Sequence, residues 1–143
     1  MAASDVLIPS KFIFLFTHLL VSIVILNARQ GNIFAAVGSN VTVDSDEYTN
    51  ADDGLLAAGV ITIILVVIEM IILFNGITLF YDRLNLFSSV FHGLGTILYA
   101  WYNLEQWHWY VIWYLWAIFS LIPGIFEIGT ALFATVYYKK LNR

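Results

Sequence analysis

Residues 55–80 read LLAAGVITIILVVIEMIILFNGITLF, and Glu69 is the only charged residue among them. An α-helix needs about 20 apolar residues to cross the hydrocarbon core of a bilayer, which is roughly 30 Å thick. This stretch is long enough to cross that core with some tilt. The sequence therefore predicts a tilted transmembrane helix over 55–80.

Three more apolar runs predict further spans, at about 8–27, 84–102 and 109–138, so residues 1–143 are expected to form a single transmembrane domain. The joints between the last three spans are short, which makes consecutive helices antiparallel neighbours. We therefore expect an all-α membrane protein, a four-helix transmembrane bundle. A cleaved signal peptide is the alternative interpretation of the first run, although no small-residue cleavage site follows it closely.

The composition also indicates that the bilayer is the solvent. Of 143 residues, 61% are hydrophobic and 11% are charged, whereas soluble domains have about 45–50% apolar and about 25% charged residues. This balance excludes a soluble monomer. The net charge of -4 argues against a nucleic-acid partner, because such proteins carry clustered basic side chains. The absence of cysteine excludes disulfides and thiolate metal sites.

The basic residues predict which side of the membrane each end of the chain faces. Both termini of a four-span chain lie on the same side, and that side would hold five basic residues, against Arg29 alone on the other. Basic residues in short loops stay in the cytosol, so we expect both termini to be cytosolic. The five residues are Lys11, Arg83, Lys139, Lys140 and Arg143.

The joint between the first two spans, 28–54, is the one long polar segment of the sequence. It holds Arg29 and five carboxylates, a net charge of -4, and is expected on the non-cytosolic side. Its richness in Asp, Asn, Ser and Thr predicts a loop that is flexible on its own. Asn40-Val41-Thr42 is a sequon, so Asn40 is a candidate glycosylation site and the chain a candidate glycoprotein. A chance match in an unmodified loop is the alternative.

The tryptophans predict the position of one membrane interface. All five lie within residues 101–116, around the joint between the last two spans. Indole rings favour the headgroup level, where the ring is apolar and the N–H stays hydrated. We interpret the cluster as an interfacial anchor, and the alternative is a platform that binds a sterol or a sugar.

Each predicted span carries one ionisable residue, and such residues usually face the bundle interior because exposure to lipid is costly. Counting residues from the flanking charges places all of them at a similar depth, roughly 10 to 20 Å. We expect them to form a polar layer that joins the helices through hydrogen bonds. The residues of this layer are His18, Glu69, His92 and Glu127.

A metal site or a proton relay is the alternative for this set of imidazoles and carboxylates. The spacing is poor for a metal, because neither Glu-x-x-His nor His-Glu-x-x-His occurs. The sequence contains no phosphate-binding loop or nucleophile motif. We therefore expect a protein that is not an enzyme and has no catalytic residue, metal or cofactor. The second hypothesis is a small intramembrane transporter or metal-dependent enzyme that uses the polar layer.

Small residues at helical spacing predict where helices approach closely. Ser89 and Gly93 in the third span, and Ser120 and Gly124 in the fourth, fit the small-xxx-small pattern. Pro123 has no backbone N–H to donate, so it predicts a kink beside the second pair. We expect these positions to serve helix packing.

Short motifs along the chain resemble those of the transmembrane protein 107 family. The likeness extends from about residue 7 to residue 140, and its specificity comes from the order and spacing of the motifs together. The motifs are Leu7-Ile8-Pro9-Ser10-Lys11-Phe12, His18-Leu19, residues 29–33, Asp46-Glu47-Tyr48, Glu69, Glu105-Gln106-Trp107 and Ser120-x-x-Pro123-x-x-x-Glu127.

This resemblance implies a four-span membrane component of the ciliary transition zone, the junction at the base of the cilium. It implies that the protein belongs to a Meckel-Gruber-type complex and recruits other transition-zone proteins. The expected partners are the bilayer and other transition-zone membrane proteins, tectonic-like and multi-span. Cilium assembly, the gating of ciliary membrane composition and developmental signalling are the processes that such a role would support.

Overall fold

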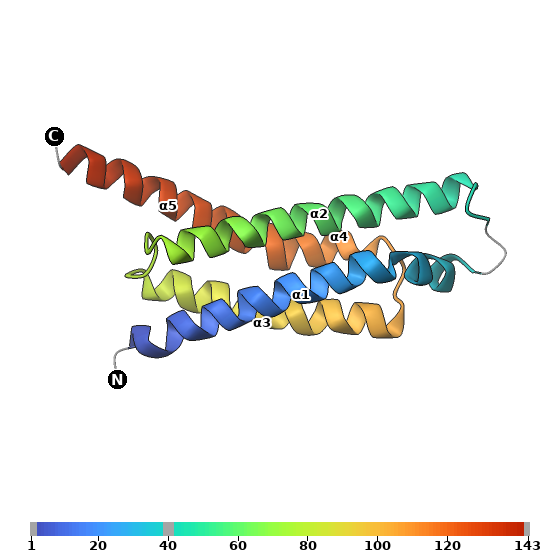
Figure 1. Ribbon diagram of the computed structural model, residues 1–143, viewed down its shortest axis with the longest axis horizontal. Coiled ribbons are helices and arrows are strands. Elements are labelled where there is room, and N and C mark those ends of the chain that lie inside the picture. The colour runs from blue at the N-terminus through green and yellow to red at the C-terminus, as the bar shows by residue number, and fades with distance from the viewer. Residues whose placement is uncertain (1–2, 39–41, 142–143) are drawn as a thin grey trace.

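The computed structural model describes the backbone of residues 3–38 and 42–141 (Figure 1). These two ranges contain helices and short turns and no strand, which confirms the predicted all-α fold. Asn40 lies outside the described residues. The helical elements are α1 (Ala3–Val37), α2 (Asp46–Phe74), α3 (Asp82–Glu105), α4 (Val111–Trp116), the π-helical turn η1 (Ala117–Leu121) and α5 (Ile122–Leu141).

The helices run side by side, and α1 begins at the same end of the bundle at which α5 ends (Figure 1). Helix α1 packs along α2 and α3, and the rod made of α4, η1 and α5 packs against the same two helices. No Cα atom of α1 comes within 8 Å of that rod in the described chain. The first helix and the last rod therefore lie diagonally across the bundle, with α2 and α3 between them.

Three segments of the described chain are long and apolar enough to cross a membrane, by length and composition alone: Val6–Val37, Asp46–Phe74 and Val111–Lys140. The chain is therefore a membrane protein with several apolar helices. Helix α3 is not among the three, because polar residues such as Asn85, His92 and Asn103 interrupt its apolar pattern. It still packs inside the bundle, and its role as a fourth span stays a prediction.

The first two helices extend well beyond the predicted spans, so most of the segment 28–54 is helical and not a flexible loop. Ser45 caps the start of α2, because its hydroxyl accepts a hydrogen bond from the Tyr48 N–H at 3.2 Å. Asp46 and Glu47 occupy the first turn, where carboxylates interact favourably with the helix dipole.

Contacts between α1 and α2 hold this helical extension together. Arg29 Nε donates to Asp52 Oδ1 at 2.5 Å, and the rings of Phe34 and Tyr48 pack with their centroids 5.3 Å apart. Ile33 is fully buried beside them. The high number of polar residues predicts a loop here. In the structure these polar residues lie on the outer faces of two helices, and the few apolar residues pack between them.

The other joints also differ from their predicted bounds. Helix α2 ends at Phe74 and not at residue 80, because Asn75 closes its last turn and Gly76 adopts φ 72°, a left-handed conformation that suits glycine. Residues 75–81 then form a turn that leads into α3. The last rod begins at Val111 rather than at residue 109.

The π-helical turn changes which residues of the last rod face inward. The N–H of Ile122 bonds to the carbonyl of Ala117, five residues earlier, so the turn holds one residue more than an α-helical turn. The buried positions accordingly step from Leu115 to Ser120 and then on to Glu127. Pro123 is the second residue of α5, one position past the turn, where the irregular helix accommodates its missing N–H.

Candidate functional site

The inward face of α1 carries both apolar and polar residues. Its buried positions recur at intervals of four and three, which places them on one side of the helix. Each of these side chains is at most 1% exposed: Lys11, Leu15, His18, Ser22 and Ile25. An ammonium and an imidazole are therefore held at the bundle centre by the same spacing that buries leucine and isoleucine.

The inward faces of α2 and α3 repeat this arrangement. On α2 the apolar sequence is interrupted by Thr62 and Glu69, both fully buried. On α3 the buried positions are mostly polar or small, which lets the neighbouring helices approach this face: Asn85, Ser88, Ser89, His92, Gly95, Tyr99 and Tyr102. The bundle interior is therefore lined by polar groups over much of its length.

The first polar cluster is built around an ion pair between the diagonal helices. Lys11 Nζ lies 2.7 Å from Glu127 Oε1, and both side chains are fully buried. The same ammonium donates to Asn85 Oδ1 at 3.0 Å, and the Thr78 hydroxyl donates to Glu127 Oε1 at 2.5 Å. Asn85 in turn donates to the carbonyl of Thr78 at 3.1 Å. This cluster joins α1, α3, α5 and the turn before α3.

The second polar cluster joins all the helical rods near the middle of the bundle. His92 Nε2 lies 2.9 Å from Glu69 Oε2, which links α3 to α2. His18 from α1 contacts the His92 carbonyl through Nδ1 at 3.4 Å and the Ser120 hydroxyl through Nε2 at 3.2 Å. The Tyr99 hydroxyl lies 3.4 Å from Ser120 Oγ.

The direction of these bonds follows from the chemistry of the partners. A carbonyl oxygen only accepts, so His18 Nδ1 carries the proton that it donates to the His92 carbonyl. In the neutral ring His18 Nε2 is then the acceptor, and the Ser120 hydroxyl donates to it. Ser120 can accept in turn from Tyr99. Through these contacts His18 connects α1 to α3 and η1.

Two glycines allow the helices to approach this cluster. A Cβ on Gly95 would lie 2.8 Å from His18 Cε1, so only glycine leaves room for the ring. A Cβ on Gly124 would lie 3.5 Å from Glu69 Oε1 and from Leu65 Cδ2, which is ordinary van der Waals contact, so this position packs directly against α2. Gly93 faces Phe14 of α1 in the same way, at 3.3 Å.

The structure divides the predicted polar layer between the two clusters. His18, Glu69 and His92 lie together, whereas Glu127 belongs to the cluster of Lys11. Lys11 was predicted as a flanking cytosolic charge, and that placement is wrong because its ammonium lies inside the bundle. Thr62, which helical spacing places on the same face as Glu69, also belongs to the second cluster. Further members that the sequence pattern did not single out are Thr78, Asn85 and Tyr99.

The clusters contain acceptors and donors that still lack a partner. Among the described side chains, Glu69 Oε1, His92 Nδ1 and Glu127 Oε2 are buried and make no hydrogen bond. No three His, Cys, Asp or Glu side chains of the described residues are placed to hold a metal ion. The two clusters join the helices to one another through charged and neutral hydrogen bonds between buried side chains.

Comparison with known proteins identifies the family. The model of the transmembrane protein 107 family, described as a transmembrane protein, matches residues 7–131. The chain belongs to the transmembrane protein 107 family. The resemblance inferred from the local motifs is thereby confirmed.

Named relatives in the transmembrane protein 107 family match nearly the whole chain. Transmembrane protein 107 of Rattus norvegicus is 30% identical over 131 residues, which cover 92% of this chain and 91% of that protein. The Homo sapiens protein has the same identity and coverage, and the Danio rerio protein is 27% identical over 90% of this chain and 93% of its own. No solved structure matches the chain. These names describe a transmembrane protein and no catalytic activity.

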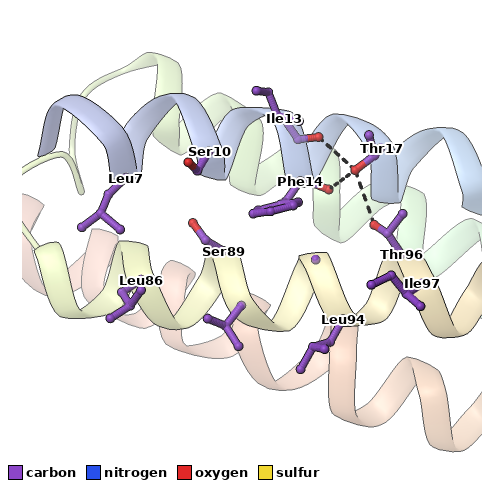
Figure 2. Close-up of a pocket in the computed structure, with 12 residues that line it drawn as sticks. Leu7, Ser10, Ile13, Phe14, Thr17, Leu86, Ser89, Leu94, Thr96 and Ile97 are labelled. Carbon is purple, nitrogen blue, oxygen red and sulfur yellow. Dashed lines mark hydrogen bonds between the residues drawn. The ribbon is translucent and has the colours of Figure 1, made fainter. Parts of the chain in front are cut away.

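The segment that matches the transmembrane protein 107 family model contains both polar clusters, from Lys11 to Glu127. It also contains a groove of about 590 Å³ between α1 and α3, shown in Figure 2. Ser10 and Ser89 face each other across this groove, and the hydroxyls of Thr17 and Thr96 lie 3.5 Å apart near its far end. Its walls are otherwise apolar, as expected of a surface that faces lipid.

Proposed function

We propose that this protein is a non-enzymatic membrane component of the ciliary transition zone. In this role it belongs to a Meckel-Gruber-type complex, recruits other transition-zone proteins, and supports cilium assembly and the gating of ciliary membrane composition. The observation that carries the proposal is the family match over residues 7–131, which includes nearly the whole helical bundle.

The architecture supports a scaffold as the mode of action. Both polar clusters bond one helix to another, and their groups point inward and not toward a cavity that opens to solvent. Outside its helices the described chain consists only of short turns. Partners of the protein therefore bind to helix faces or to the helical extension formed by residues 28–37 and 46–54.

The proposed orientation places both termini in the cytosol. Exposed Arg83, Lys139 and Lys140 lie toward the end of the bundle where α1 begins and α5 ends (Figure 1). Arg29 lies at the opposite end and is paired with Asp52. The surplus of basic side chains at the first end favours the cytosol there, even without the buried Lys11. Asn40 then belongs to the opposite, non-cytosolic side, where glycosylation takes place.

Imaging in a ciliated cell that lacks its own family member tests the function. A tagged copy is expected to concentrate at the cilium base, next to the basal body, and to restore other transition-zone membrane proteins to that position. Removal of residues 141–143 serves as the matched control and is expected to leave the position unchanged. Uniform plasma-membrane signal from a well-expressed, folded copy would contradict the proposal.

A further inference from the structure

The basic side chains of the described chain fall into two groups. Lys11 and Arg29 each form an ion pair with a carboxylate. Arg83, Lys139 and Lys140 are exposed, and none of them pairs with a carboxylate among the described side chains. The uncompensated cations therefore all lie on α3 and α5, at the end of the bundle proposed to be cytosolic.

An apolar groove between α3 and α5 opens beside one of these cations, Arg83. It consists of two adjoining hollows that share Phe126. The larger, of about 380 Å³, has Tyr81 and Phe133 on its wall. The smaller, of about 270 Å³, has Arg83 and Phe87 on its wall. The Arg83 guanidinium thus lies in the wall of a groove that is otherwise mostly apolar.

A contact between two aromatic rings forms the floor of this groove, and its outer side is exposed. The rings of Phe87 and Phe126 meet edge to face with centroids 5.4 Å apart, which ties α3 to α5. Phe126 is 57% and Phe133 67% exposed. A Cβ on Gly129 would meet nothing within 4 Å. No described part of the chain covers the groove, so its outer side is open to an occupant.

The charges indicate which occupant fits. At this end α3 and α5 carry three exposed cations against Asp82 alone, and Asp82 does not line either hollow. A basic side chain at the rim of an apolar groove between transmembrane helices is suited to an anionic lipid headgroup. An apolar partner helix would fill the hollow but would leave Arg83 uncompensated.

We propose that the groove between α3 and α5 binds an anionic phospholipid of the adjacent leaflet. Its phosphate lies against the Arg83 guanidinium and the Tyr81 hydroxyl, both of which donate hydrogen bonds. One acyl chain follows Phe126 and Phe133 along the open side of Gly129. This site is separate from the buried clusters and does not depend on the proposed ciliary role.

Lipid titration of the purified full chain in detergent, read by native mass spectrometry, tests the site. Phosphatidylserine is expected to bind about fivefold more tightly than phosphatidylcholine with the same chains, because phosphatidylserine carries a net negative charge and phosphatidylcholine does not. Arg83→Gln is expected to weaken phosphatidylserine binding about fivefold, because one basic side chain near the surface contributes about that factor. Lys140→Gln removes the same charge outside the groove and is expected to change binding less than twofold.

A second variant tests the groove without altering any charge. Gly129→Leu fills the open side and is expected to weaken phosphatidylserine binding while the melting temperature stays that of the unmodified chain. Soluble glycerophosphoserine is expected not to compete, since it lacks the chains. Equal binding of both lipids, equal losses in Arg83→Gln and Lys140→Gln, unchanged binding in Gly129→Leu, or competition by the free headgroup would each overturn the proposal.

Discussion

Lys11 Nζ reaches Glu127 Oε1 at 2.7 Å, although no Cα atom of α1 lies within 8 Å of α5. The two side chains cross the centre of the bundle and meet in a position that neither lipid nor water reaches. A buried charge is costly unless it is paired and hydrogen-bonded, and here Asn85 and Thr78 supply the additional bonds. The pair therefore fixes the distance between the two diagonal rods.

Breaking this pair from one side is expected to be more harmful than replacing both partners. Lys11→Met leaves the Glu127 carboxylate buried without its cation, and the free energy of unfolding is expected to fall by about 3 to 5 kcal/mol. The double variant with Glu127→Leu is expected to recover most of that loss. Unfolding in detergent measures both. A double variant as unstable as Lys11→Met would contradict this account.

The partly exposed pair of Arg29 and Asp52 is the matched control. Its side chains are 35% and 24% exposed, so solvent screens the interaction. Arg29→Gln is expected to lower the free energy of unfolding by at most about 1 kcal/mol.

The two carboxylates are expected to respond differently to an amide. Glu69→Gln keeps an oxygen that accepts from His92, so it is expected to cost about 1 kcal/mol, whereas Glu69→Leu removes the bond and costs more. Glu127→Gln loses the charge that Lys11 requires and is expected to be the more harmful amide. A Glu69→Gln variant that folds and assembles normally but loses activity in cilium assembly would favour a chemical role over a structural one.

The π-helical turn predicts where a deletion is tolerated. Removing Ile118 takes away the residue that the turn adds, so Ser120 and Glu127 are expected to stay inward on a regular helix. Removing Ile64 from α2, which is similarly exposed, rotates Glu69 away from His92 by about 100°. Gel filtration and thermal melting are expected to show a folded chain for the first deletion only. Loss of the fold in both deletion variants would indicate that the length of the last rod matters more than which of its residues face inward.

Gly124 and Gly129 are expected to differ although only five positions separate them. A Cβ at Gly124 would already touch Leu65 and Glu69, so the longer side chain of Gly124→Leu is expected to separate α5 from α2 and abolish concentration at the cilium base. Gly129→Leu points into open space and is expected to localise normally. Imaging of tagged variants at equal expression distinguishes them. Normal placement of Gly124→Leu would show that close packing at this position is dispensable.

Protease added to sealed microsomes tests the orientation. With both termini cytosolic, a C-terminal tag is expected to be trimmed and an epitope within 28–54 to be protected. Modification of Asn40, seen as a mass shift removed by glycosidase, is expected only in this orientation. Protection of the C-terminal tag would reverse the assignment.

The helical spacing of polar residues predicts more members of the polar network than the pattern of charges does. Lys11 precedes His18, and Asn85 precedes His92, by seven residues each, which places both on inward faces. The positive-inside argument counted Lys11 only as a charge of the cytosolic side, because that argument considers where a charge lies in the sequence and not which helix face carries it. Thr78 gives no such signal, since it lies in a turn and reaches Glu127 only through the tertiary fold.

The helical extension shows a similar limit. Ser45 with Asp46 and Glu47 is a local start signal for a helix, yet the high polarity of the segment predicts a flexible loop. The deciding contact, Phe34 against Tyr48, brings together residues on opposite sides of the joint. The π-helical turn likewise depends on tertiary packing, because it sets which residues of the last rod face α2 and α3. Pro123 alone predicts a kink, but it does not predict this shift of the buried positions.

The diagonal pair also constrains how the chain is made. Lys11 is synthesised well before its carboxylate partner, which lies in the second turn of the last helix, α5. Until α5 is added, the ammonium lacks this counter-ion, and an unpaired charge within a transmembrane segment is costly. Without α5 the Lys11 ammonium would lack its carboxylate partner. The ion pair therefore forms only after α5 has joined the helices that precede it in the chain.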